Sequence, residues 1–190
     1  MKLSRGFKRT VAYSVYDCAA RGKSSISADH LLLGLFREDF PLIDDVTNTF
    51  SLDSFKLLDT VLGENPETFE SAKADHVSLG PDALEILQYA ELEAYGFAHE
   101  VIRPEHLFLG IMDSKSSMLN NFLLEKEVVC ALVRELVAVT RFGETGTSDR
   151  HIYELDPLTR MEIQHIDFSS PLFHENDLSI SVLQLFKGYL

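Results

Sequence analysis

The 190-residue chain carries 17 basic and 30 acidic side chains, a formal net charge of −13, and 45% of its residues are hydrophobic. This composition is typical of a globular protein, and the acidic charge argues against one that binds nucleic-acid phosphates. No apolar run is long enough for a membrane span, and no apolar stretch follows the basic N-terminal residues, as a secretory signal would require. Two cysteines, Cys18 and Cys130, do not form a disulfide framework, so we expect a reducing, cytoplasmic location.

The first predicted helix spans about residues 7 to 22. Its apolar and small positions recur at spacings of three and four: Phe7, Val11, Ser14, Cys18 and Gly22. This pattern indicates one buried helical face with room for a close neighbour.

The segment Gly22-Lys23-Ser24, at the end of that helix, has the last three residues of a phosphate-binding loop. The first glycine of such a loop would stand at position 17, where this chain has Asp17. A carboxylate there would repel phosphates, so we interpret Gly22 as a helix stop.

The next segment, from Ile26 to Leu35, is apolar almost all round and predicts a short buried helix with Ser27 as its N-cap. Asp29 falls in the first turn, where a negative charge is stabilised by the helix dipole. We interpret His30 as a structural residue that pins the helix to a neighbour. Gly34 costs about 1 kcal/mol relative to Ala inside a helix, and a close helix–helix contact would account for it. Helices over residues 41–50 and 52–62 follow.

The same segment recurs from Ile102 to Ile111, at an offset of 76 in the numbering and with five of ten positions identical. Glu105, His106 and Gly110 therefore take the roles of Asp29, His30 and Gly34. The offset extends upstream without a gap, since Ala83, Leu87, Ala90 and Ala94 repeat the spacing of the first helix. Helical patterns over 117–124 and 128–139 complete the second copy.

The repeat predicts an all-α fold, a two-fold pseudo-symmetric bundle of eight helices built from two four-helix units. We expect a domain over residues 1–141, with repeat one at 1–63, a polar connector at 64–78 and repeat two at 79–141. The positions expected in the core, and not in a site, are Val11, Val15, Leu31, Leu33, Leu87, Leu107, Leu109 and Val133.

Residues 142–190 form a separate C-terminal extension. The stretches 152–155 and 161–168 flank Asp156-Pro157 and are compatible with a small β-hairpin, whereas 178–186 fits a helix or a strand. An exposed hairpin edge could pair with a partner or a second copy of the chain. Alternatively, the extension folds back over the bundle to cover apolar surface.

We expect no catalytic residue, no metal and no cofactor. His99 and His106 are seven positions apart, which allows shared metal ligation without supporting it, and His151, His165 and His174 are interpreted as solvent-facing. Both cysteines lie in helical apolar patterns with no base implied nearby, and no serine lies in a nucleophile elbow.

Each repeat has a long helix with small residues on one face, followed by the pattern Ile-x-x-Asp/Glu-His-Leu-x-Leu-Gly-Leu/Ile. This arrangement, present twice, resembles the Clp N-terminal repeat domain of Clp-type AAA+ unfoldases. The resemblance covers residues 3 to about 140. It implies a compact, non-catalytic all-α domain that docks substrates and adaptors for an ATPase ring. Because only the extension, 142–190, remains after the repeats, we expect a stand-alone double repeat without the ATPase module.

The resemblance also implies candidate contact residues. In one branch of the family each repeat binds phosphorylated arginine, and the matching positions are Ser4 and Asp29 in repeat one and Gly80 and Glu105 in repeat two. Asp29 is one methylene shorter than the usual Glu, and Gly80 has no hydroxyl.

The partners implied by the resemblance are a Clp ATPase, a protease subunit, an adaptor or an unfolded client, with no nucleic acid and no membrane. The alternative function is a sensor that binds a small molecule or a modified residue, such as phosphoarginine, between or within the repeats.

Overall fold

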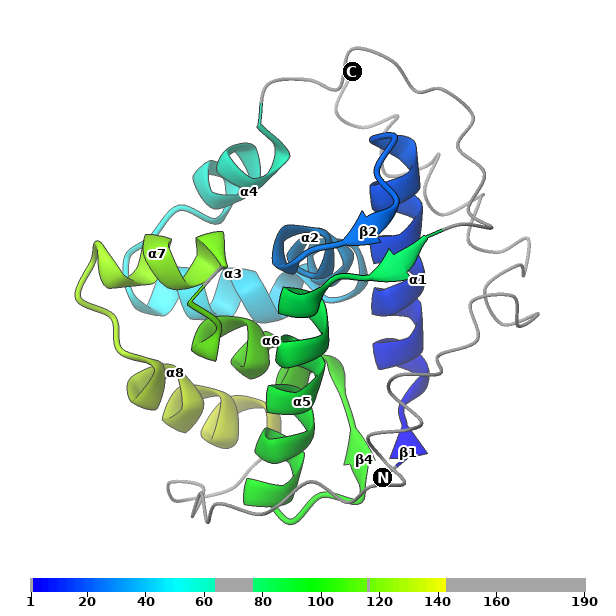
Figure 1. Cartoon of the computed structure of the whole chain (residues 1–190). Helices are drawn as coiled ribbons and strands as arrows, with labels where there is room; N and C mark the ends of the chain where they lie inside the picture. The colour runs from blue at the N-terminus through cyan, green and yellow to red at the C-terminus, as the bar shows by residue number, and fades with distance from the viewer. Residues whose placement is uncertain (1, 64–76, 116, 143–190) are drawn as a thin grey trace.

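The computed structural model describes residues 2–63, 77–115 and 117–142, and this part of the chain is all-α (Figure 1). Its eight α-helices are α1 (Arg5–Ala20), α2 (Ala28–Glu38), α3 (Phe40–Thr49), α4 (Ser54–Leu62), α5 (Pro81–Gly96), α6 (Pro104–Asp113), α7 (Met118–Leu124) and α8 (Cys130–Val137). A π-helical turn, Ala138–Phe142, continues α8. The predicted fold class and helix number are confirmed, while the predicted hairpin lies outside the described residues.

The helices recur at the spacing predicted from the sequence. The starts of α5, α6 and α8 follow those of α1, α2 and α4 at one constant offset, 76 in the numbering. The two halves, α1–α4 and α5–α8, are therefore copies of one four-helix plan. None of the helices in the described ranges has the length and apolar character needed to cross a bilayer.

Four two-residue strands were not predicted, and they join the two halves. Strand β1 (Lys2–Leu3) pairs in parallel with β4 (Val101–Ile102), and β2 (Ser25–Ile26) pairs in parallel with β3 (Ser78–Leu79). The two pairs lie at opposite ends of α1 (Figure 1). Each half thus contributes one strand to each pair, so the strands cross between the halves.

The core forms where α1 packs along α2, α5 packs along α6, and the two inner helices α2 and α6 meet. All eight positions predicted to be core are buried there. A Cβ added to Gly34 would lie 2.3 Å from the carbonyl oxygen of Thr10, and one added to Gly110 would lie 2.7 Å from that of Ile86. These equivalent glycines allow the backbones of the paired helices to approach closely.

Candidate functional site

The four residues that the resemblance singles out lie at the starts of helices. Ser4 and Gly80 are the N-caps of α1 and α5, and Asp29 and Glu105 are in the first turns of α2 and α6. In the sequence each N-cap belongs with the acidic residue of its own repeat. In the structure the strand pairs place each N-cap beside the acidic residue of the other repeat.

Two equivalent backbone hydrogen bonds hold each N-cap next to the segment that precedes the acidic residue of the other repeat. The N–H of Ser4 donates to the carbonyl of Ile102 at 2.9 Å, just before the helix that carries Glu105. The N–H of Gly80 donates to the carbonyl of Ile26 at 2.9 Å, just before the helix that carries Asp29. The structure therefore contains two candidate sites at opposite ends of α1, one combining Ser4 with Glu105 and the other Gly80 with Asp29.

At the Asp29 site, one carboxylate oxygen has no partner. The carboxylate accepts a hydrogen bond from the backbone N–H of Met118 at the start of α7. Its Oδ1 is buried and has no hydrogen-bond partner in the described part of the chain. Burial raises the pKa of Asp29, and the negative charge of Asp82 adds to this effect.

At the other site, Glu105 forms an ion pair with an arginine of the same chain. Arg141, in the π-helical turn, forms an ion pair with Glu105 at 3.7 Å between Nε and Oε1, and a second one with Asp39. Asp39 is the N-cap of α3 in the first half. The two candidate sites therefore differ, because a guanidinium lies against the carboxylate of Glu105, whereas one oxygen of Asp29 is left without a partner among the described residues.

The two caps also differ. The Oγ of Ser4 accepts a hydrogen bond from the N–H of Phe7 at 3.1 Å and so caps α1. At Gly80 a Cβ would lie 2.6 Å from the carbonyl oxygen of Ile26, closer than a side chain allows. The missing hydroxyl at Gly80 follows from this tight approach of the two segments.

The equivalent histidines His30 and His106 cap the helices in which they lie. The Nδ1 of His30 accepts from the N–H of Ser27 at 3.0 Å, and the Nδ1 of His106 accepts from the N–H of Arg103 at 2.9 Å. Both residues occupy the third helical position, where a capping box usually has Glu or Gln. The sequence signal for this capping role is that each histidine stands three residues after the N-cap of its helix.

Both capping histidines are neutral. Burial lowers the pKa of His30 to about 4 and that of His106 to about 3, and nearby positive charges, such as that of Arg103 at His106, act in the same direction. An Nδ1 that accepts a backbone N–H cannot carry a proton, so the geometry and the pKa values agree.

His99 and His106, considered above as joint metal ligands, bond to each other, with 2.8 Å between Nδ1 of His99 and Nε2 of His106. Across residues 2–63, 77–115 and 117–142, no three His, Cys, Asp or Glu side chains gather in a way that could hold a metal ion.

Asp17, which excluded a phosphate loop, has a structural role that sequence reasoning missed. Its carboxylate accepts two hydrogen bonds from Arg37 of α2, at 2.6 and 3.0 Å. At the equivalent position in α5, Glu93 accepts two from Arg134 of α8, at 2.7 and 2.9 Å. Gly22 follows α1 with φ of +64°, as expected of a helix stop.

The two thiols are poor nucleophiles. Burial raises the pKa of Cys18, and burial together with the charge of Asp113 raises that of Cys130 to about 12. Neither thiol therefore ionises appreciably near neutral pH.

Comparison with known proteins gives relatives in sequence and in fold. No protein-family model matches the chain. It is 25% identical over 114 residues to the ATP-dependent Clp protease ATP-binding subunit ClpC of Staphylococcus aureus, and 26% identical over 111 residues to that of Staphylococcus saprophyticus. Each match covers 58% of this chain and only 13% of the relative.

The fold is similar to the N-terminal domain of the caseinolytic protease associated chaperone ClpD from Arabidopsis thaliana. The TM-score is 0.54 at 18% identity, and the match covers 75% of this chain and 96% of that domain. The repeat at a constant offset, the sequence relatives and the shared fold agree: the described part of this chain is similar in sequence and in fold to the Clp N-terminal repeat domain.

Proposed function

We propose that the chain is a non-catalytic docking module that binds proteins for Clp-type unfolding or proteolysis. The observation that carries this proposal is the fold likeness to a Clp chaperone's N-terminal domain, 96% of which is covered. By contrast, the chain spans 13% of the length of its ClpC relatives, so their ATP-dependent activity is not transferred here.

We further propose that the module is residues 1–141, with units at 1–63 and 79–141, and that 142–190 is an extension to it. The constant offset between helix starts supports this division. The partners proposed are a Clp ATPase, a protease subunit, an adaptor or an unfolded client, in the cytoplasm.

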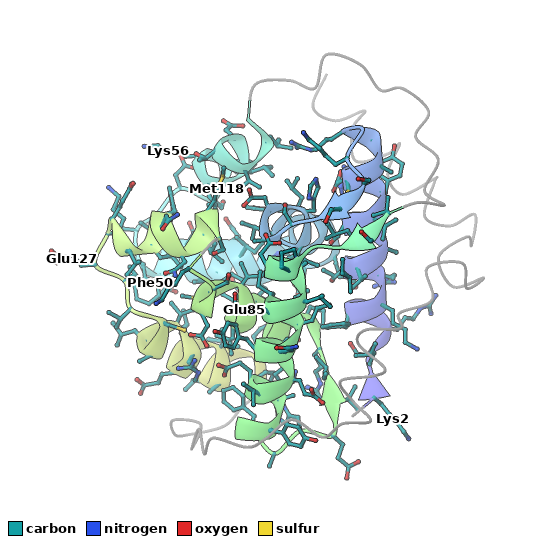
Figure 2. The ribbon with its side chains drawn as sticks, viewed as in Figure 1. Lys2, Phe50, Lys56, Glu85, Met118 and Glu127 are labelled. Atoms are coloured by element: carbon teal, nitrogen blue, oxygen red, sulfur yellow. The ribbon has the colours of Figure 1, made fainter. Side chains whose placement is uncertain are left out.

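The contact surface that we favour surrounds Asp29. Helices α4 and α7 contact each other there, and each exposes a large apolar side chain, Phe55 (50% exposed) and Met118 (37% exposed). Figure 2 labels one residue on each of these helices, Met118 on α7 and Lys56 on α4. We call Asp29, Phe55 and Met118 the Asp29 face. An apolar and acidic face suits a partner segment with apolar and basic side chains.

The test is affinity purification of the tagged full chain from its own cell lysate, with quantification of Clp subunits, followed by binding to the purified partner. The variant Phe55→Ser with Met118→Ser should weaken binding at least tenfold. A matched control, Leu124→Ser, removes an apolar side chain that is 56% exposed at the other end of α7 and should leave binding unchanged. Reproducible absence of every Clp subunit and unfolded client would contradict the proposal.

A second candidate, the sensor of a small molecule or modified residue, is favoured by one observation. The unpartnered Oδ1 of Asp29 is an acceptor that a ligand's N–H groups could use, whereas Glu105 already has Arg141. Thermal unfolding with phosphoarginine, and with arginine as its unphosphorylated control, tests this candidate. A ligand-dependent rise in Tm that Asp29→Asn abolishes and Glu105→Gln keeps would support it; no shift with either ligand would remove it.

A further inference from the structure

The end of the domain where β1 pairs with β4 carries four basic side chains: Lys2 of β1, Arg5 and Lys8 of α1, and Arg103, the N-cap of α6. Strand pairing brings them to one end of the fold, because the N–H of Ser4 donates to the carbonyl of Ile102, the neighbour of Arg103. All four are exposed except Lys8, which is partly exposed. Figure 2 shows the side chain of Lys2 pointing away from the fold. We call these four residues the basic patch.

The carboxylates near the basic patch are mostly engaged by other arginines. Arg9 donates two hydrogen bonds to Glu38, at 2.5 and 2.8 Å, and Arg141 forms the two ion pairs described above. None of the four residues of the patch forms an ion pair with a carboxylate of the part of the chain that the structure describes. Even with the exposed Glu100 before β4 counted, this end presents an excess of positive charge to solvent.

The equivalent end of the fold, where β2 pairs with β3, has no cation at any of the four matching positions. At the offset of 76 these positions are Ser78, Pro81, Leu84 and Ser27. The same strands and helix starts therefore form without basic side chains. A positive charge at Arg5, in the first turn of α1, is also disfavoured by the helix dipole, and that turn has no acidic residue to offset it. The stability of the fold thus does not account for the basic patch.

The described chain ends beside the basic patch. Arg103 lies over Phe142, with its Cζ 6.0 Å from the ring centroid. Residues 143–190 follow directly, and they carry eight acidic and three basic side chains, a net charge of −5. The first four acids of this extension are Glu144, Asp149, Glu154 and Asp156. The last of them stands 14 positions after Phe142, and an extended chain of that length spans up to about 46 Å, enough to bring all four to the patch.

We propose that the basic patch is a docking surface for the chain's own acidic extension, through Glu144, Asp149, Glu154 and Asp156. A single exposed ion pair contributes little, but four acids on one tethered segment act together at an effective concentration in the millimolar range. Docking there covers the end that holds Ser4 and leaves the Asp29 face, at the opposite end of α1, open. The two surfaces are distinct, so this contact does not depend on the proposed Clp partners.

The first test is zero-length cross-linking of the full chain with a carbodiimide, which joins a lysine amine to an adjacent carboxylate as an amide and takes up the water released. We expect Lys2 and Lys8 to be linked to the four acids within the monomer. The matched control is Lys23, which is exposed just beyond the other end of α1 and should give few such links. Raising the salt from 0.01 to 0.5 M should lower the yield at Lys2 and Lys8 at least about threefold, because ions screen exposed charges.

Two results of the cross-linking would overturn the proposal. Equal yields at Lys8 and Lys23 would show that the acidic extension has no preferred surface on the domain. Links found only in covalent dimers would show that the patch takes the extension of a second copy and not its own.

The second test uses trypsin cleavage after Arg150, which lies among the four acids, followed by mass spectrometry. Arg5→Ser with Lys8→Ser removes two cations that have no ion pair among the described residues, so the helical circular dichroism should stay unchanged. Cleavage should become at least about threefold faster, because the extension is released more often, whereas Lys23→Ser should leave the rate as it is. The same double variant should lower the cross-links of Lys2. Equal cleavage rates in both variants and the unmodified chain would overturn the proposal.

Discussion

In the first half of the domain Asp17 of α1 pairs with Arg37 of α2, whereas the equivalent Glu93 of α5 pairs with Arg134 of α8. The position equivalent to Arg37 is Asp113, a second acid 3.4 Å from Arg134. The duplicated backbone therefore fixes where a buried carboxylate sits and requires a guanidinium beside it. It does not fix which helix supplies that guanidinium.

The strongest test of this difference is to remove each arginine. Arg134→Leu should lower the free energy of unfolding by about 3–5 kcal/mol, because it takes the cation from Glu93, whose side chain is fully buried. Arg37→Leu should cost less, since the side chain of Asp17 retains 8% exposure. Urea unfolding of both variants measures the difference. The double variant Arg134→Leu with Glu93→Leu should recover most of the loss, and equal costs for the two single variants would contradict the ranking.

The two close helix contacts, at Gly34 between α1 and α2 and at Gly110 between α5 and α6, should also differ in how much stability an added methyl group costs. Gly34→Ala should lower stability by about 2 kcal/mol, because its Cβ would lie 2.3 Å from a backbone oxygen, and the better helix propensity of Ala offsets only part of this clash. Gly110→Ala should cost less, since its nearest contact is 2.7 Å. Thermal and urea unfolding report both values. A stabilised Gly34→Ala would show that α1 and α2 can separate freely.

The histidine caps should make stability fall in acid. A histidine whose folded pKa lies below its unfolded value stabilises fully above 6.5, and this stabilisation is lost as the pH falls towards the folded pKa. Each cap should therefore cost about 1–2 kcal/mol between pH 7 and pH 5. The loss should level off near pH 4 for His30 and near pH 3 for His106.

The controls are His30→Gln and His106→Gln, which keep an acceptor at the third helical position and remove the titration. Urea unfolding from pH 4 to 8 should show a shallower pH dependence for each variant than for the unmodified chain. Identical slopes in all three proteins would contradict the assignment of the acid sensitivity to these caps.

The smallest expected effect on stability concerns the residues with positive φ that follow the C-terminal ends of the two long helices, α1 and α5. Gly22 follows α1 with φ of +64°, and the equivalent Ala98 follows α5 with φ of +54°. Left-handed backbone costs an alanine about 1 kcal/mol more than a glycine. Gly22→Ala should lower stability by about that amount, and Ala98→Gly should raise it. Changes of the same sign in thermal unfolding would show that the two stops are not equivalent.

The sequence predicted the helices well because each has a strong period and, in most cases, a polar cap, and because the second copy repeats the first. It did not predict the strands, since two residues such as Lys2–Leu3 carry no periodic signal and pair only when the distant Val101–Ile102 is in place. For the same reason it grouped Ser4 with Asp29 by repeat, although strand pairing places Ser4 beside the helix of Glu105. The pairing of Arg141 with Asp39 is equally a property of the folded chain, because the two residues are 102 positions apart.

The crossed strand pairs bear on how the molecule holds together. Two separate copies of the four-helix unit could form the same two pairs with each other, each giving one strand and receiving one, as an isologous dimer does. Joining the copies in one chain makes that association intramolecular, so it no longer depends on protein concentration. A unit expressed alone would leave both of its strands without their partners and should dimerise to recover them.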